Sequence, residues 1–186
     1  MQMDHQRAPL TPTQQRFDPI ARWIHWSMAF LLLVMIGLGF YATSLSYYDP
    51  FYHRSTFWHR SLGVMVFGLL LLRLAWRTYH PPPPLPASQP QWERHAARWT
   101  HLALYLLMFL APISGYLVTT ADGRSIDVFG WFELPALLPA AKGRETWMGT
   151  IHLVLTLLFC SLLTLHIGAA LKHHFINRDG ILRRMW

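Results

Sequence analysis

Four histidines of this 186-residue chain lie inside long apolar segments, where a polar ring needs a partner. They are His25, His59, His152 and His166. Polar and ionisable groups inside a bilayer are costly and are usually functional. Imidazole is a common metal ligand, and one ring from each of two facing helices can hold an iron porphyrin between them. The alternative is that each histidine only hydrogen-bonds a neighbouring helix.

His152 and His166 belong to one apolar segment, TIHLVLTLLFCSLLTLH at 150–166. Fourteen residues separate them. At 100° per residue this spacing falls about 40° short of four full turns, so both rings face nearly the same way. Their separation along a helix axis is about 21 Å. This geometry predicts two stacked sites, one in each leaflet of a membrane.

Composition indicates a membrane protein, because 53% of the residues are hydrophobic and only 13% are charged. The single cysteine, Cys160, excludes a disulfide framework and a Cys-rich iron–sulfur site, and we interpret it as a small buried apolar residue. The absence of a Cys-x-x-Cys-His motif excludes covalently attached haem. Zinc fits poorly, since each depth offers two histidines and structural zinc takes four ligands. The polar N-terminus has no signal-peptide core.

Four apolar runs predict an all-α fold, an integral membrane four-helix bundle with spans at about 20–46, 55–78, 96–121 and 146–172. Asp-Pro pairs at 18–19 and 49–50 predict helix starts. The proline-rich stretch after Tyr79 predicts an extended linker. The expected organisation is a polar N-terminal segment (1–18), a four-helix membrane domain that contains the four histidines (19–172) and a cytoplasmic tail (173–186) that forms a surface segment.

Lysine and arginine predict the orientation of the bundle. With both termini cytoplasmic, the inner side receives eleven basic residues and the outer side five. This is a positive-inside bias, and it explains the net charge of +7 by topology and anionic lipid better than by nucleic acid. The orientation then sorts the histidines by depth. His59 pairs with His152 near the periplasmic side, and His25 pairs with His166 near the cytoplasmic side.

Two depth-matched pairs favour haem ligation over structural hydrogen bonding. Ligation by two histidines leaves no open iron position, so electron transfer is favoured over oxygen chemistry. Two further sites remain open. His101, just inside the third span, either replaces a ligand or lies beside the haem. His173 and His174, which follow the fourth span, are either solvated interfacial residues or part of a site for a quinone head group.

The chain resembles the bacterial cytochrome b561 family of di-haem membrane proteins. The resemblance rests on five features in order: RWIHW, WHRSLGVMVFGLLLLRLAWR, a proline-rich loop, THLALYLLMFLAPISGY, and the histidine pair fourteen apart followed by ALKHHF. It implies two b haems with iron ligands at His25 and His166 on the inner side and at His59 and His152 on the outer side. It also implies quinone contact at His173, with Arg77 as a weaker candidate.

The predicted function is an oxidoreductase of the bacterial inner membrane that passes electrons from a periplasmic donor to ubiquinone, or in the reverse direction from the quinol. Some members of the family resemble superoxide oxidases, which makes superoxide the expected donor. The outer loops carry five basic and five acidic residues, so only a local patch is positive there: Arg54, Arg60, Lys142 and Arg144. Two alternatives are a haem b anchor subunit of a hydrogenase or formate dehydrogenase, and a haem-free membrane scaffold or transporter.

Overall fold

The structure is a computed structural model that describes residues 16–85 and 89–186. Four long helices dominate it: α1 (Pro19–Ser44), α2 (Pro50–Tyr79), α3 (Gln91–Thr119) and α4 (Arg144–Lys172). All four are long and apolar enough to cross a membrane. This confirms the predicted all-α, four-helix membrane fold. Most of the predicted N-terminal segment (1–18) and three residues of the proline-rich linker (86–88) lie outside the described residues.

Helices α1 and α2 begin where acidic residues cap them. The Asp18 carboxylate accepts a hydrogen bond from the Ala21 N–H at 3.0 Å, and that of Asp49 accepts one from the Phe51 N–H at 2.8 Å. Both predicted Asp-Pro starts are therefore present. As a result α2 begins at residue 50 rather than 55. Helix α3 begins at 91 rather than 96, after Pro90 and without a side-chain cap. The apolar pattern marks the lipid-embedded part of each helix, while polar turns extend beyond it.

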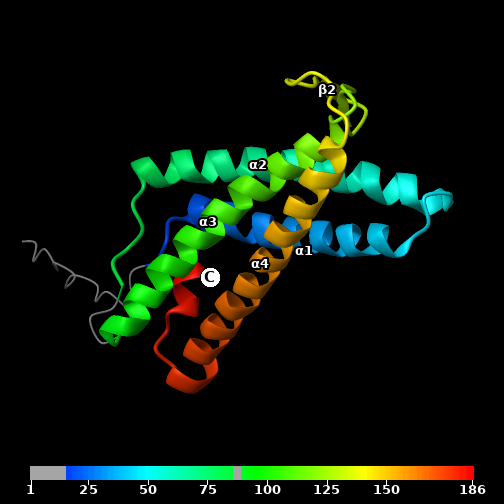
Figure 1. The fold of residues 1–186 in the computed structure, drawn as a ribbon. Helices are drawn as coiled ribbons and strands as arrows, with labels where there is room; N and C mark the ends of the chain where they lie inside the picture. Colours follow the sequence, from blue (N-terminus) through cyan, green and yellow to red (C-terminus); the bar gives the residue numbers. More distant parts are fainter. Residues whose placement is uncertain (1–15, 86–88) are drawn as a thin grey trace, which may run out of the picture.

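The helices form two antiparallel pairs. Helix α1 packs along α2 and α3 packs along α4, and the two pairs cross each other (Figure 1). Each helix contributes one residue to a buried apolar cluster: Leu32, Val66, Leu104 and Phe159. Many large apolar side chains on the helices are exposed, including Phe30, Leu33 and Leu165. Because these helices cross a membrane, those side chains face lipid.

A small hairpin covers one end of the bundle, which we call the hairpin end. Strands β1 (Ile126–Val128) and β2 (Phe132–Leu134) pair antiparallel. The hairpin packs on α2, where the Phe129 N–H donates to the buried Ser61 hydroxyl at 3.1 Å. These strands were not predicted from the sequence. Each strand has only three residues, and the turn between them has positive φ at Phe129 and Gly130.

Both described ends of the chain lie together at the opposite end, which we call the tail end (Figure 1). After α4 come a π-helical turn (His173–Asn177) and a 3₁₀ turn (Leu182–Met185). The final turn folds back onto the start of α1: the Phe17 N–H donates to the Arg184 carbonyl at 3.0 Å, and Trp26 Nε1–H donates to the Met185 carbonyl at 2.7 Å. Arg184 is only 3% exposed. The expected surface segment is therefore partly buried.

Candidate functional site

Two of the predicted site histidines meet near the hairpin end. His59 from α2 and His152 from α4 have ring centroids 6.2 Å apart, with ring planes at 89°. A metal–imidazole bond is about 2.0 to 2.1 Å long, so two histidines on opposite sides of one metal ion have centroids about 6 Å apart. The observed spacing fits an iron porphyrin held between these two rings.

The orientation of each ring is fixed from behind by a backbone carbonyl of the adjacent helix. His59 Nδ1 lies 2.9 Å from the Met35 carbonyl of α1, and His152 Nδ1 lies 2.9 Å from the Ala111 carbonyl of α3. A carbonyl oxygen can only accept, so Nδ1 carries the proton in both histidines and Nε2 keeps its lone pair. This is the tautomer that a metal ligand needs, and such an outer hydrogen bond is typical of metal-bound histidine.

A glycine stands four residues after each of these carbonyls and makes room for the ring. A Cβ atom at Gly39 would lie 3.0 Å from His59 Cε1, and one at Gly115 would lie 3.1 Å from His152 Cε1. Nine in ten real Cβ contacts are longer than this, so each ring would have to shift by a few tenths of an ångström. The same carbonyl-and-glycine arrangement thus occurs once in each helix pair.

Three histidines gather nearer the tail end. The rings of His101 on α3 and His166 on α4 have centroids 5.3 Å apart. His25 on α1 lies within electrostatic range of both, and its own ring contact is with Trp26 at 5.4 Å. The structure therefore places His25 and His166 in one cluster, as the depth argument predicts, and adds His101 to it. Which two of the three ligate iron stays a prediction.

An apolar layer separates the two histidine levels. Phe159, seven residues from both His152 and His166 on α4, packs there with Leu32, Val66 and Leu104 from the other helices. A second cluster of Ile24, Met28 and Leu70 lies toward the tail end. Within residues 16–85 and 89–186, three or more His, Cys, Asp or Glu side chains nowhere come together as a metal site. Paired histidines with a porphyrin fit this arrangement better than a zinc site does.

Two arginines of α2 lie beside the tail-end histidines. The charge of Arg73 acts on His25, His101 and His166. Its Nε–H donates to the Tyr105 hydroxyl at 2.8 Å, and Arg77 Nη1–H reaches the same hydroxyl at 3.3 Å. Tyr105 is not among the site residues predicted from the sequence, and Arg73, which binds it, lies close enough for its charge to act on all three histidines.

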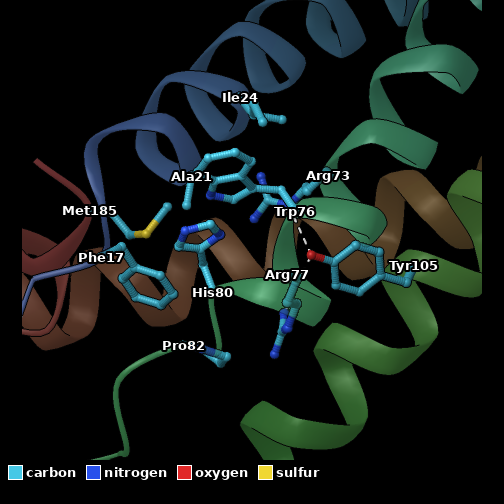
Figure 2. Close-up of a pocket in the computed structure, with 10 residues that line it drawn as sticks. All are labelled: Phe17, Ala21, Ile24, Arg73, Trp76, Arg77, His80, Pro82, Tyr105 and Met185. Carbon is cyan, nitrogen blue, oxygen red and sulfur yellow. Dashed lines mark hydrogen bonds between the residues drawn. The ribbon is translucent and has the colours of Figure 1, made fainter.

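These arginines line a pocket that Figure 2 shows in close-up. Its aromatic wall is Trp76, whose ring stacks on His80 at 4.1 Å and whose Nε1–H donates to the Asp18 carboxylate at 3.1 Å. Met185 from the tail closes one side. The pocket combines two guanidinium groups, which can bind the carboxylates of a ligand, with aromatic walls, which can contact a flat apolar molecule.

The two predicted quinone residues do not share contacts. Arg77 contacts Tyr105, as described above. His173, in the π-helical turn, lies between two carboxylates: its Nδ1 is 2.5 Å from Asp179 Oδ2, and its Nε2 is 3.9 Å from Glu93 Oε2. Sequence reasoning missed both acids, because they lie 80 and 6 residues from His173 in the chain. His174 contacts only the ring of Phe175 among the ring contacts of the described residues.

The family model of prokaryotic cytochrome b561 matches residues 16–186. The chain belongs to the prokaryotic cytochrome b561 family. Cytochrome b561 homolog 2 of Escherichia coli K12 is 44% identical over 176 residues, 94% of this chain and 93% of that protein. Cytochrome b561 homolog 1 of the same organism is 26% identical over 91% of this chain and 96% of its own length. A Yersinia pestis protein named "Probable superoxide oxidase CybB" is 26% identical over 87% of this chain and 90% of its own length.

Family membership confirms the resemblance seen in the sequence and implies haem b binding. This cytochrome b561 family member is a multi-pass protein of the bacterial inner membrane, in contact with lipid through its four spans. Its activity is electron transfer of the oxidoreductase type.

Proposed function

We propose that this protein carries electrons across the inner membrane from periplasmic superoxide to ubiquinone, through two b haems. The hairpin end faces the periplasm and the tail end the cytoplasm, with both termini cytoplasmic. His59 and His152 ligate the outer haem, and His25 and His166 ligate the inner one. The excess of lysine and arginine at the tail end supports this orientation.

The observation that carries the proposal is the geometry of His59 and His152. Their 6.2 Å centroid separation suits ligation from two sides, and both Nδ1–H groups are already committed to carbonyls. A purely structural histidine needs neither a facing histidine nor a glycine opposite its ring. A haem-free scaffold or transporter explains this arrangement poorly.

When bound, haem b supplies a one-electron redox centre without an open coordination position. The protein's own residues do the rest. The carbonyls of Met35 and Ala111 orient the outer rings, and the apolar layer around Phe159 keeps water out of the space between the two levels. Arg73 supplies positive charge beside the inner histidines, where haem carboxylates need a partner.

Superoxide as the donor is supported by the name of the Yersinia pestis relative and by two basic side chains at the hairpin end. Arg60 Nε–H donates to the Thr56 carbonyl at 3.1 Å, and Arg144 Nη2–H donates to the Pro139 carbonyl at 2.8 Å. These bonds to neutral carbonyls hold the guanidinium groups without cancelling their charge. In contrast, Arg124 forms an ion pair with Asp122. The local field thus attracts an anion although the outer loops are neutral in sum.

We propose that ubiquinone, the electron acceptor, binds at His173. Arg77 is a second candidate residue. His173 lies at the cytoplasmic end of α4, and its side chain is 13% exposed. Its ring nitrogens can offer a hydrogen bond to a quinone oxygen. The balanced reaction takes two superoxide ions, one quinone and two protons to two oxygen molecules and one quinol.

The test is an optical spectrum of the purified protein with haem quantitation, followed by addition of superoxide and a short-chain ubiquinone. We expect two haems per chain, reduced by superoxide and reoxidised by quinone. His152→Ala should remove the outer haem and His166→Ala the inner one. A protein with one haem or none would contradict the scheme, and loss of the same haem in both variants would contradict the pairing.

A further inference from the structure

His173 is held in a group of side chains that come from three parts of the chain. Glu93 lies in the first turn of α3, His173 follows α4, and Asp179 follows the π-helical turn. All three are largely buried, with side-chain exposures of 12%, 13% and 22%. Lys172 Nζ binds the second oxygen of Glu93 at 2.8 Å. Two acids and one imidazole so placed form a built cluster rather than a solvated surface.

The π-helical turn is what brings Asp179 onto His173. Arg178 takes a left-handed backbone conformation at φ 51, and the Asp179 N–H lies 3.4 Å from the His173 carbonyl. One Asp179 carboxylate oxygen then accepts from the Ile181 N–H at 3.1 Å, which leaves the other, Oδ2, facing His173. Single π turns are often found at functional sites. The position of Asp179 is therefore fixed by its own backbone.

The two nitrogens of His173 have different surroundings. Asp179 Oδ2 at 2.5 Å can only accept, so Nδ1 carries a proton. The Asn177 amide, 3.1 Å from the same nitrogen, can present its oxygen there equally well. Nε2 faces Glu93 across 3.9 Å, which is too long for a hydrogen bond. The free nitrogen of a fixed imidazole thus points at a carboxylate with a gap between them.

We propose that Glu93, His173 and Asp179 are the proton-delivery group for quinone reduction, a role that rests on the proposed function. Asp179 is a positioning residue that holds Nδ1–H and stabilises the imidazolium. His173 Nε2–H gives its proton to a quinone oxygen, which leaves a neutral ring protonated at Nδ1. Glu93 takes a proton from cytoplasmic water and returns one to Nε2. Two such cycles supply the two protons that two electrons require to form quinol.

The surrounding charges suit this role. Lys172, 44% exposed, is the cation that faces Glu93, and the carboxylates of Glu93 and Asp179 face His173 from both sides. The carboxylate of Asp179 therefore fixes Nδ1–H, while that of Glu93 lies near enough to Nε2 to exchange a proton with it.

The test compares Glu93→Gln, Asp179→Asn and Asp179→Ala with wild type and with the control Glu133→Gln in the hairpin. The haems of each purified protein are reduced with dithionite and excess reductant is removed. Reoxidation by a short-chain ubiquinone is then timed at several pH values and quinone concentrations, which gives a limiting rate, written kcat below, and a half-saturating quinone concentration, written KM. Glu93→Gln should lower kcat about tenfold or more with little change in KM, and it should acquire a solvent isotope effect. Asp179→Ala should raise KM, and Asp179→Asn, which keeps an acceptor for Nδ1–H, should raise it less.

Spectra and haem potentials should stay unchanged in all of these variants, because His173 and Asp179 follow His166 by seven and thirteen residues and Glu93 precedes His101 by eight. Wild-type rates in both Glu93→Gln and Asp179→Ala across the pH range would overturn the proposal. Equal KM values for Asp179→Asn and Asp179→Ala would refute the positioning role. If wild-type reduced haem does not react with quinone, the proposed function itself fails and this inference falls with it.

Discussion

Two glycines of α1, only two residues apart, differ in what an added methyl group would meet. At Gly39 it would lie 3.0 Å from His59 Cε1, whereas nothing stands within 4 Å at Gly37. We predict that Gly39→Ala pushes the His59 ring from its place, at a cost of about 1–3 kcal/mol, and lowers the content of the outer haem. Gly37→Ala is the control and should keep both haems. Equal haem content in the two variants, measured by pyridine haemochrome assay, would contradict this reading.

The charge of Arg73 leads to a second residue-level prediction. It acts on His25, His101 and His166, so it should favour the reduced inner haem. Arg73→Gln should lower the reduction potential of that haem by an amount on the order of tens of millivolts. A spectroscopic redox titration measures this. Arg60→Gln, beside the outer histidines, should shift the other haem instead, and a shift of the same haem by both variants would contradict the assignment.

At the scale of single residues, the sequence reveals candidate ligands better than it reveals the groups that hold them in place. His59 and His152 stand out because a polar ring in an apolar segment is unusual. The carbonyls of Met35 and Ala111 that orient them have no signature, since every residue carries a backbone carbonyl. Tyr105 and Asp179 were missed for a different reason: their partners are set by helix packing and by a π turn, which no local pattern predicts.

Among the elements, the start of α1 depends on one acid. Asp18 is partly desolvated, which raises its pKa, but hydrogen bonds from the Ala21 N–H and Trp76 Nε1–H outweigh this and leave the pKa below its ordinary value. An acid with a lowered pKa in the folded state stabilises it at neutral pH, and this contribution is lost as the pH falls below about 4. The melting temperature of the protein in detergent should therefore fall as the solution is acidified.

Asp18→Asn separates charge from capping in that experiment, because asparagine is also a good N-cap. The variant should show a flatter dependence of the melting temperature on pH between about 6 and 3. Asp49→Asn, at the start of α2, is the control for the cap alone. A pH profile for Asp18→Asn as steep as that of wild type would show that the Asp18 carboxylate contributes nothing to acid sensitivity.

The elements themselves follow from the sequence to different degrees. Helix existence was predictable, because apolar runs of about 20 residues can satisfy their backbone only as helices in lipid. The starts of α1 and α2 were predictable from Asp-Pro, yet the beginning of α3 at Gln91 was not, since its first turns are polar. The hairpin of β1 and β2 was invisible because each strand has three residues and is stabilised by α2.

For the whole molecule, orientation decides which way the proposed electron transfer runs. The structure puts both described ends of the chain at one end of the helices, with the Phe17 N–H bonded to the Arg184 carbonyl. The charge count supports the proposed cytoplasmic location of that end, since it carries ten basic residues among those that the structure describes, against five at the hairpin end. In the proposed orientation His59 and His152 lie nearest the periplasm, where superoxide would arrive.

Because Cys160 is the only cysteine, orientation can be measured by single-cysteine labelling in a Cys160→Ser background. Arg124→Cys reports on the hairpin end, where the Arg124 side chain is 85% exposed, and Arg183→Cys reports on the exposed tail. In intact spheroplasts a membrane-impermeant maleimide should label position 124 at once and position 183 only after permeabilisation. The reverse pattern would place His173, Glu93 and Asp179 in the periplasm. Quinone protons would then come from the outside, and the direction proposed for the electrons would have to be inverted.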